Sequence, residues 1–267
     1  MSSRLFPALL KYWRGHRGSS QLDLALEAGI SARHLSFLES GRARPSEATA
    51  VRLLDALAVP LRDRNEALRA AGFEPRFAEP ALTEIPDAIE QALARMMHVQ
   101  EPYPLLVLSP TSDVLRQNRA GSRLFSRFVA EPSALATELN MFSLVFDPRL
   151  MRPFIANWSS VARQMLVRLH RELLALGGDE RLVSLAARVR RYPDVPKTWH
   201  APDFSGTVEP VFTVQLRRDD VALAFFTTIT SFSFPRLVTL EELRIESAFP
   251  LDDATRSFCE NAAAADP

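Results

Sequence analysis

Apolar residues in the first 72 positions recur at steps of three and four, which is the period of an amphipathic α-helix packed on a core. The recurring positions are Leu5, Leu9, Leu10, Trp13, Leu22, Leu24, Ala25, Val51, Leu54 and Leu57. Each run of regularly spaced apolar residues is short and is followed by residues that commonly end helices. The pattern therefore predicts a bundle of short helices in the first part of the chain.

Helix-boundary residues divide this stretch into five predicted helices. Serine side chains are preferred N-caps, whereas glycine takes the left-handed conformation that often ends a helix. The boundaries are the Gly18-Ser19-Ser20 run, the Gly29-Ile30-Ser31 turn, Gly41, the Pro45-Ser46 pair, Pro60 and Gly72.

A change of composition follows the fifth predicted helix. Six prolines lie between Phe73 and Pro110 and flank one helical stretch over residues 87–99. We therefore predict a first domain over residues 1–76, a linker and connecting helix over 77–100, and a second domain over 101–267. The second domain holds 13 of the 17 phenylalanines.

The second domain combines helical and strand patterns. Helical periodicity runs over about 148–176 and 179–190, and apolar residues alternate with polar ones over 212–216, 221–229 and 243–249. A polar connection, residues 217–220, predicts a hairpin between the first two strands. In the third run, Glu246 falls on the side expected to be half exposed. With shorter strands at 104–108 and 114–115, we expect an α+β domain whose antiparallel sheet is covered on one face by helices.

The charge of the chain is unevenly distributed although its net value is zero. Residues 1–76 carry 12 Lys and Arg against 8 Asp and Glu, while residues 77–267 carry 20 against 24. A basic excess is the electrostatic requirement for phosphate contacts. The excess is modest, so we expect affinity for DNA to depend on a homodimer.

Several classes of protein are disfavoured by composition. A hydrophobic share of 47% supports a real core, but no run of about 18 uncharged apolar residues is present for a membrane span. Cys259 is alone, and the CxxC, HExxH and GxSxG motifs are absent. We expect a soluble cytoplasmic protein that is not an enzyme and binds no metal or cofactor.

The stretch over residues 21–46 has the features of a DNA-binding helix-turn-helix. In this motif the second helix enters the major groove while the first crosses the backbone. Ala25 allows the helices to approach closely, and Gly29 allows the left-handed turn between them. Leu35 and Leu38 should face the core, and the outward residues that could read bases are then Ala32, Arg33, Ser36 and Phe37.

Other residues of the motif are assigned to phosphate contacts or to structure. Gln21 and Ser31 begin their helices, where backbone N–H groups can bind phosphate. Arg42 and Arg44 follow the second helix and are expected to contact phosphates as well. Glu39 would repel DNA if it faced it, so we predict a structural ion pair between Arg14 and Glu39.

Longer stretches of the sequence resemble a known family. The segment LALEAGISARHLSFLESGRARPS resembles the Xre/Cro-type helix-turn-helix, and VPLRDRNEALRAAGFEP followed by EPYPLLVL is similar to regulators with an MmyB-like C-terminal domain. The resemblance implies a bacterial transcription regulator with five N-terminal helices, a PAS-like ligand-binding domain that takes a fatty acid or similar lipophilic molecule, a double-stranded DNA operator and a homodimer.

One departure from this family lies after the predicted strand at 104–108. Relatives usually show an aspartate-arginine pair and a tryptophan ahead of the asparagine that Asn118 matches, whereas this chain reads SPTSDVLRQN. The shape of the pocket and its ligand therefore do not follow from the resemblance.

An effector pocket in the second domain should be mostly apolar with a few polar groups that orient the ligand. The candidate lining residues are Phe142, Phe146, Trp158, Met165, Phe212, Phe225 and Phe232. Arg163 and Arg168 could pair with a ligand carboxylate, or could belong to a solvated helix face. The apolar residues could equally fill a core, in which case the protein would be an interaction or dimerisation scaffold whose second domain binds no ligand.

Overall fold

The structure is a computed structural model that describes residues 5–136, 139–175, 179–196, 198, 211–233 and 235–265. The chain divides into two compact units. The first contains residues 1–84 together with 232–241, and the second contains 85–231 together with 242–267. Each unit is described by itself.

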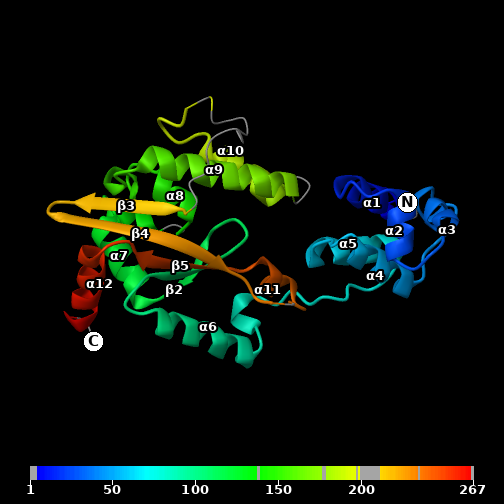
Figure 1. Cartoon of the computed structure of the whole chain (residues 1–267), viewed down its shortest axis with the longest axis horizontal. Coiled ribbons are helices and arrows are strands. Elements are labelled where there is room, and N and C mark those ends of the chain that lie inside the picture. Colours follow the sequence, from blue (N-terminus) through cyan, green and yellow to red (C-terminus); the bar gives the residue numbers. More distant parts are fainter. Residues whose placement is uncertain are drawn as a thin grey trace. The chain divides into compact units, whose positions relative to one another are not determined.

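Five α-helices form the bulk of the first unit (Figure 1). They are α1 (Leu5–His16), α2 (Gln21–Glu27), α3 (Ala32–Glu39), α4 (Glu47–Ala56) and α5 (Leu61–Ala71). Leu10, Trp13, Leu24, Leu35 and Leu53 are among the residues of their shared core. The prediction of five short helices around one core is confirmed, although Leu5 and Leu22 from the apolar pattern are more than half exposed.

Local capping accounts for the helix boundaries. Ser20 caps α2 and forms a reciprocal capping box with Asp23, while Ser31 and Ser46 accept backbone N–H groups at the starts of α3 and α4. Gly29 has φ +63° in the turn between α2 and α3, a conformation that side chains other than glycine rarely adopt. The α2–α3 geometry is therefore encoded by neighbouring residues.

The first unit also includes a segment that is distant in the sequence, residues 232–241. This segment contains most of α11 (Val238–Glu242), where the sequence pattern indicated no helix. Glu241 accepts the Leu61 N–H at 2.6 Å and thereby caps α5, whose N-cap residue Pro60 makes no side-chain cap bond. The backbone N–H of Val238 donates to the Ala78 carbonyl at 2.9 Å. The segment is thus tied to this unit by hydrogen bonds.

The second unit is built on a five-stranded antiparallel sheet in the order β2-β1-β5-β4-β3. Its strands are β1 (Leu105–Leu108), β2 (Val114–Gln117), β3 (Thr213–Arg218), β4 (Val221–Thr230) and β5 (Arg244–Pro250). The predicted hairpin joins β3 to β4, with Val214 opposite Phe225 and Leu216 opposite Leu223. The five predicted strands are all present, and β5 lies at the centre of the sheet.

Helices lie on both sides of this sheet, which corrects the expectation of one covered face. Figure 1 shows α9 (Trp158–Ala175) on one side and α6 (Asp87–Gln100) on the other. All four residues of β1 are buried, as a strand covered on both faces requires. Helix α6 packs against this strand and groups with the second unit.

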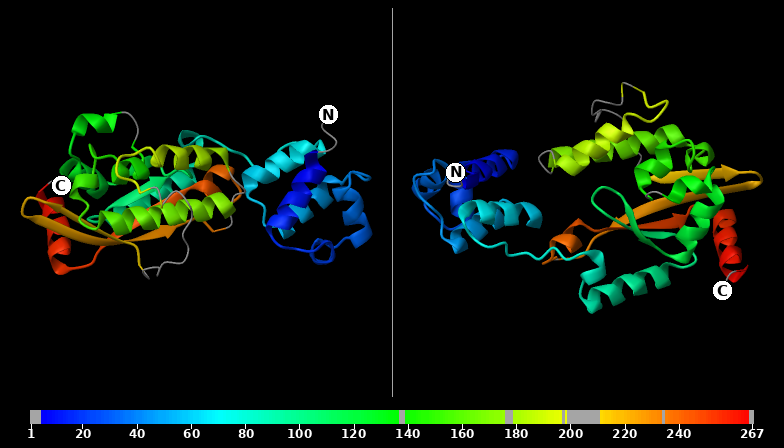
Figure 2. Two further views of the ribbon diagram at one scale, coloured as in Figure 1. Left: turned by 90° about the horizontal axis from the view of Figure 1, so that it is seen from above. Right: turned by 180° about the vertical axis from the view of Figure 1, so that it is seen from behind.

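The remaining helices surround the same core, as the two further views show (Figure 2). They are α7 (Arg119–Phe128), α8 (Met141–Phe146), α10 (Glu180–Val189) and α12 (Asp253–Ala265), with short 3-10 turns at Leu82–Glu84, Pro132–Ala136 and Arg152–Phe154. Helical periodicity led us to expect an α-helix from about residue 148. The helix α9 begins only at Trp158, because the 3-10 turn Arg152–Phe154 and irregular backbone precede it.

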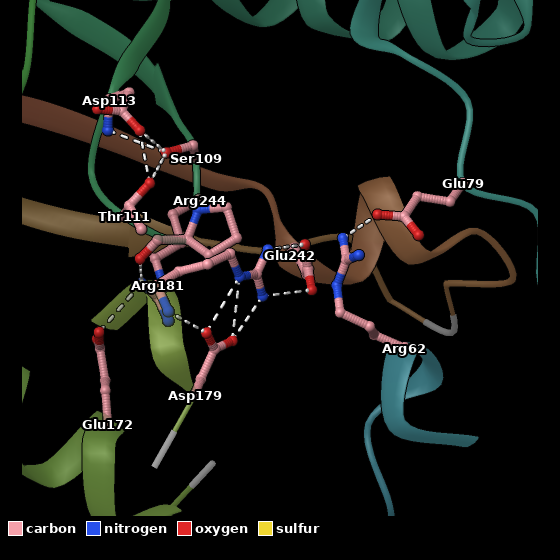
Figure 3. Close-up of polar contacts among 11 residues, drawn as sticks. Arg62, Glu79, Ser109, Thr111, Asp113, Glu172, Asp179, Arg181, Glu242 and Arg244 are labelled. Atoms are coloured by element: carbon pink, nitrogen blue, oxygen red, sulfur yellow. Dashed lines mark hydrogen bonds and ion pairs between the residues drawn. The ribbon is translucent and has the colours of Figure 1, made fainter. Parts of the chain in front are cut away.

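A cluster of charged side chains joins the start of α10 to the residues before β5 in the second unit (Figure 3). Arg181 at the start of α10 binds Asp179 at 2.7 Å and Glu242 at 3.1 Å. Its guanidinium is thereby shared between two carboxylates.

Among the helices in the part of the chain that the structure describes, none has the length and apolar character of a membrane span.

Candidate functional site

Helix α3 of the first unit is held to α1 and α2 by a cluster of charged and polar side chains. Arg14 donates from Nε to Oε1 of Glu39 at 2.6 Å and from Nη2 to Oε2 at 3.1 Å. Gln21 donates from Nε2 to the same carboxylate at 2.7 Å. The expected Arg14–Glu39 ion pair is present, and it joins α1 and α3 while Gln21 adds α2.

The outward face of α3 presents an aromatic ring flanked by two cations. Leu35 and Leu38 are fully buried, so Phe37 lies toward the other side of the helix. The Arg33 guanidinium lies 5.4 Å from the Phe37 ring centroid, and that of Arg42 lies 6.0 Å from it. Both arginines are exposed. Stacking on Phe37 restricts the conformations of both arginine side chains.

The other residues that the sequence analysis assigned to DNA contacts differ in their exposure and in their hydrogen-bond partners. Arg44 and Ser31 are exposed, and the Ser31 hydroxyl accepts the His34 N–H at 3.1 Å as an N-cap. Ser36 is half buried, and Ala32 packs against the core of the unit. Because its amide binds Glu39, Gln21 is positioned by that carboxylate. The sequence did not anticipate this link, which depends on a fold contact between residues 18 positions apart.

An apolar cavity of about 80 Å³ lies within the second unit. The sheet contributes Leu106, Phe225 and Ala248, and the helices contribute residues that include Met141 from α8 and Met165 from α9. Other lining residues are Pro104, Leu124, Phe125, Leu144, Val145, Met151, Ile155, Val161, Phe212, Val214, Leu216 and Thr227. This cavity is small compared with typical ligand pockets of roughly 300–1,000 Å³.

Two ionisable side chains, Arg168 and Glu246, line this otherwise apolar cavity. The Nε atom of Arg168 is buried and has no hydrogen-bond partner among the described residues, while Glu172 Oε1 lies 3.8 Å from it. Burial raises the pKa of the Glu246 carboxyl, and the nearby Arg168 lowers it by a smaller amount. An unsatisfied donor beside a buried carboxyl is costly unless a further group completes the site.

Glu246 corrects one expectation from the strand pattern. Alternation placed this residue on the half-exposed side of its strand, but it is 8% exposed and lies opposite Leu106 in the sheet. Since β5 is the central strand, both of its faces are covered. Alternation separated the two faces of β5 correctly but could not show that the face with Glu246 and Ala248 lines a cavity.

Of the seven candidate ligand residues, Met165, Phe212 and Phe225 line the cavity. Phe142 and Phe146 are buried in the surrounding core instead, and their rings stack at 6.2 Å. Trp158 packs beside them and donates its indole N–H to the Val145 carbonyl at 2.8 Å. Phe232 belongs to the segment assigned to the first unit. Periodicity could not separate the residues that face the cavity from those that only fill the core.

The segment that departs from the family pattern forms a polar turn. Asp113 accepts hydrogen bonds from Ser109 at 2.7 Å, Thr111 at 2.5 Å and Asn140 at 2.7 Å (Figure 3). Burial raises the pKa of Asp113, but these hydrogen bonds outweigh it and hold the pKa below its usual value. The carboxylate is therefore committed to holding the turn between β1 and β2.

The side chain of Asn118, which matches the family's asparagine, forms hydrogen bonds with backbone groups and has a structural role. Its Oδ1 accepts the N–H groups of Leu105 at 3.0 Å and Gly121 at 2.9 Å, and its Nδ2 donates to the Tyr103 carbonyl at 2.8 Å. The side chain is buried and caps α7. It holds the start of β1 against α7 rather than lining the cavity.

The two units correspond to two families of known domains. Residues 10–63 match the helix-turn-helix family, and residues 89–261 match the MmyB-like transcription regulator ligand binding domain. Because the second match extends over more than half of the sequence, the chain belongs to the MmyB-like regulators.

Other comparisons add no functional detail. None of the curated proteins matches the sequence. A solved structure described as "Structure of an RNA-binding Light-Oxygen-Voltage Receptor" is similar with a TM-score of 0.30 and 12% identity, over 97% of this chain and 63% of that one. The chain thus spans less than two thirds of the length of that receptor.

Proposed function

We propose that this chain is a sequence-specific DNA-binding transcription regulator that acts as a homodimer and responds to a small lipophilic effector. The observation that carries the DNA-binding part is the pair of exposed arginines, Arg33 and Arg42, that lie against Phe37 of α3, a helix held to α1 by the Arg14–Glu39 pair. Arg33 reads a guanine through its O6 and N7 atoms, and Phe37 contacts a thymine methyl group. Arg42 and Arg44 bind phosphates.

The effector is an amphipathic carboxylate, of which a fatty acid is the simplest form. Support comes from Arg168, whose buried Nε needs an acceptor, and from the apolar lining of the rest of the cavity. A carboxylate would accept a charge-assisted hydrogen bond from this atom. Burial raises the pKa of the neighbouring Glu246 and so favours its neutral form, and a neutral carboxyl can donate a hydrogen bond to the second carboxylate oxygen.

Binding requires the cavity to enlarge, since about 80 Å³ is too little for a long acyl chain. Three of the lining residues are methionines, Met141, Met151 and Met165. Methionine has three rotatable side-chain bonds and adapts to irregular space. The acyl chain is accommodated by repacking of these side chains between the sheet and helices α8 and α9.

Calorimetric titration of the intact chain with straight-chain fatty acids tests the effector. Arg168→Gln is expected to weaken binding by roughly tenfold or more, because it removes the charge that pairs with the carboxylate. Arg163→Gln, an exposed position on the same helix, serves as the matched control. Equal binding by both variants and the parent chain would contradict the assignment of Arg168.

A further inference from the structure

An arginine-lined groove lies on the surface of the second unit, outside the apolar cavity. Helix α7 contributes Arg119, Arg123 and Arg127, which are spaced four residues apart and therefore follow one side of the helix. The β3–β4 hairpin contributes Arg218, and Ser122 and Ser126 lie between the arginines. The groove has a volume of about 820 Å³.

The charge of this groove is unlike that of the rest of its domain. Residues 77–267 carry 20 Lys and Arg against 24 Asp and Glu, yet four guanidinium groups converge here. Asp219 is the one carboxylate among the lining residues, and Glu101 lies 3.7 Å from Arg123. Like charges four residues apart destabilise a helix, so α7 bears this arrangement at a cost to its own stability.

Part of the groove is held in place by packing. Arg218 donates from Nη1 to the carbonyls of Arg127 at 2.5 Å and Val129 at 3.2 Å, and its guanidinium lies 4.7 Å from the Phe154 ring centroid. Arg127 in turn lies 6.0 Å from the Phe258 ring. These contacts fix one end of the groove without neutralising its charge.

The other end of the groove is available to a ligand. Arg119 is exposed and has no ion pair or side-chain hydrogen bond among the described residues. It occupies the first position of α7, where the helix dipole disfavours a cation. An anion bound in the groove would relieve both this interaction and the repulsion between neighbouring arginines.

We propose that this groove binds a small molecule that carries two or more phosphate groups. Guanidinium groups match phosphate oxygens with paired, charge-assisted hydrogen bonds, and serine hydroxyls add further donors. Arg119 and Arg127 are separated by about 12 Å along the helix axis, so they can contact different phosphates of one ligand. The volume falls within the range of roughly 300–1,000 Å³ that is typical for small-molecule sites.

The test is titration of the intact chain at low ionic strength with inorganic pyrophosphate, with a nucleoside triphosphate and with orthophosphate. Pyrophosphate and the triphosphate are expected to bind more tightly than orthophosphate, because a single phosphate cannot reach both ends of the groove. If the triphosphate binds more tightly than pyrophosphate, the source is a nucleotide; equal binding assigns the site to the diphosphate group alone. Either result supports the proposal.

Variants locate the site. The double variant Arg119→Gln/Arg127→Gln is expected to weaken pyrophosphate binding by roughly tenfold or more, because it removes two charge-assisted contacts. Arg217→Gln removes one exposed charge on the same hairpin, outside the groove lining, and should leave binding unchanged. Circular dichroism and an unchanged midpoint of thermal unfolding show that the double variant is folded.

Two results would overturn the proposal. One is the absence of pyrophosphate and triphosphate binding by the parent chain; if the double variant then also loses operator DNA affinity, the groove would be a surface for DNA. The other is phosphate binding that the double variant retains in full. Neither result depends on whether Arg168 binds a carboxylate.

Discussion

Arg14 and Glu39 are joined by two hydrogen bonds, of 2.6 and 3.1 Å, which connect the first helix of the DNA-binding unit to its recognition helix. The hydrogen bond with Glu39 raises the pKa of Arg14 above its usual value. The Glu39 side chain is 4% exposed, so its carboxylate depends on Arg14 and Gln21 for its polar contacts. The Arg14–Glu39 pair thus fixes α3 against α1.

Replacement of Glu39 by alanine is expected to destabilise the first unit by about 2 kcal/mol or more, because Arg14 loses its partner in a partly buried site. Urea unfolding followed by circular dichroism measures this change. Glu27→Ala, at an exposed position on α2, is the control and should cost less than about 0.5 kcal/mol. Equal losses in the two variants would mean that the ion pair does not stabilise the fold.

Replacement of Arg33 by alanine is expected to cost about 1–3 kcal/mol of operator affinity and to relax the base preference at one position of each half-site. Binding to a set of operators with single substitutions measures both effects. A uniform loss of affinity across all the substituted operators would instead assign Arg33 to a phosphate.

Replacement of Arg44 by alanine should have the contrasting effect. A residue that contacts phosphate contributes equally to all sequences, so its loss should weaken every operator alike and reduce the slope of log K against log salt by about 1. An unchanged salt slope would show that Arg44 does not contact the backbone.

Replacement of Asn118 by alanine is expected to destabilise the second unit by about 3 kcal/mol, since the buried N–H groups of Leu105 and Gly121 would lose their acceptor. Thermal unfolding gives the measurement. Asn261→Ala on an exposed part of α12 is the matched control. A small effect at Asn118, similar to that at Asn261, would contradict the structural role.

The stability of the second unit should depend on pH through Glu246. Because burial raises the folded-state pKa of this carboxyl above its value in the unfolded chain, the unfolded state releases its proton first as the pH rises. Stability is therefore lost as the pH increases from the unfolded pKa through the folded one. Glu246→Gln should remove this loss, whereas Asp220→Asn in the exposed hairpin should not. The same pH dependence in Glu246→Gln and the parent chain would refute this account.

The DNA-binding unit was predictable because its determinants are local. Ser20, Gly29 and Ser31 mark the α2–α3 turn within a few residues of sequence, and the Arg14–Glu39 pair follows from excluding a carboxylate from the DNA face. The cavity was less predictable. Its polar end joins Arg168 of α9 to Glu246 of β5, and alternation along a single strand cannot show which face a distant helix will cover.

The arginine groove illustrates the same limit. Arg119, Arg123 and Arg127 have visible helical spacing, but the sequence pattern did not predict a helix there, since glycine and serine interrupt it. Gly121 packs closely against β1, because a Cβ atom at this position would lie 3.2 Å from Cδ2 of Leu106. Arg218 joins the site only through the hairpin. Such a site becomes apparent once the fold has brought these elements together.

The central claim is tested most directly by fluorescence anisotropy of the intact chain with DNA from upstream of its own gene, over a series of salt concentrations. We predict saturable binding that exceeds binding to a scrambled duplex, that weakens linearly in log K against log salt, and that loses sequence preference in Arg33→Ala. Equal affinity for the operator and scrambled duplexes at every salt concentration, including the lowest, would contradict the account.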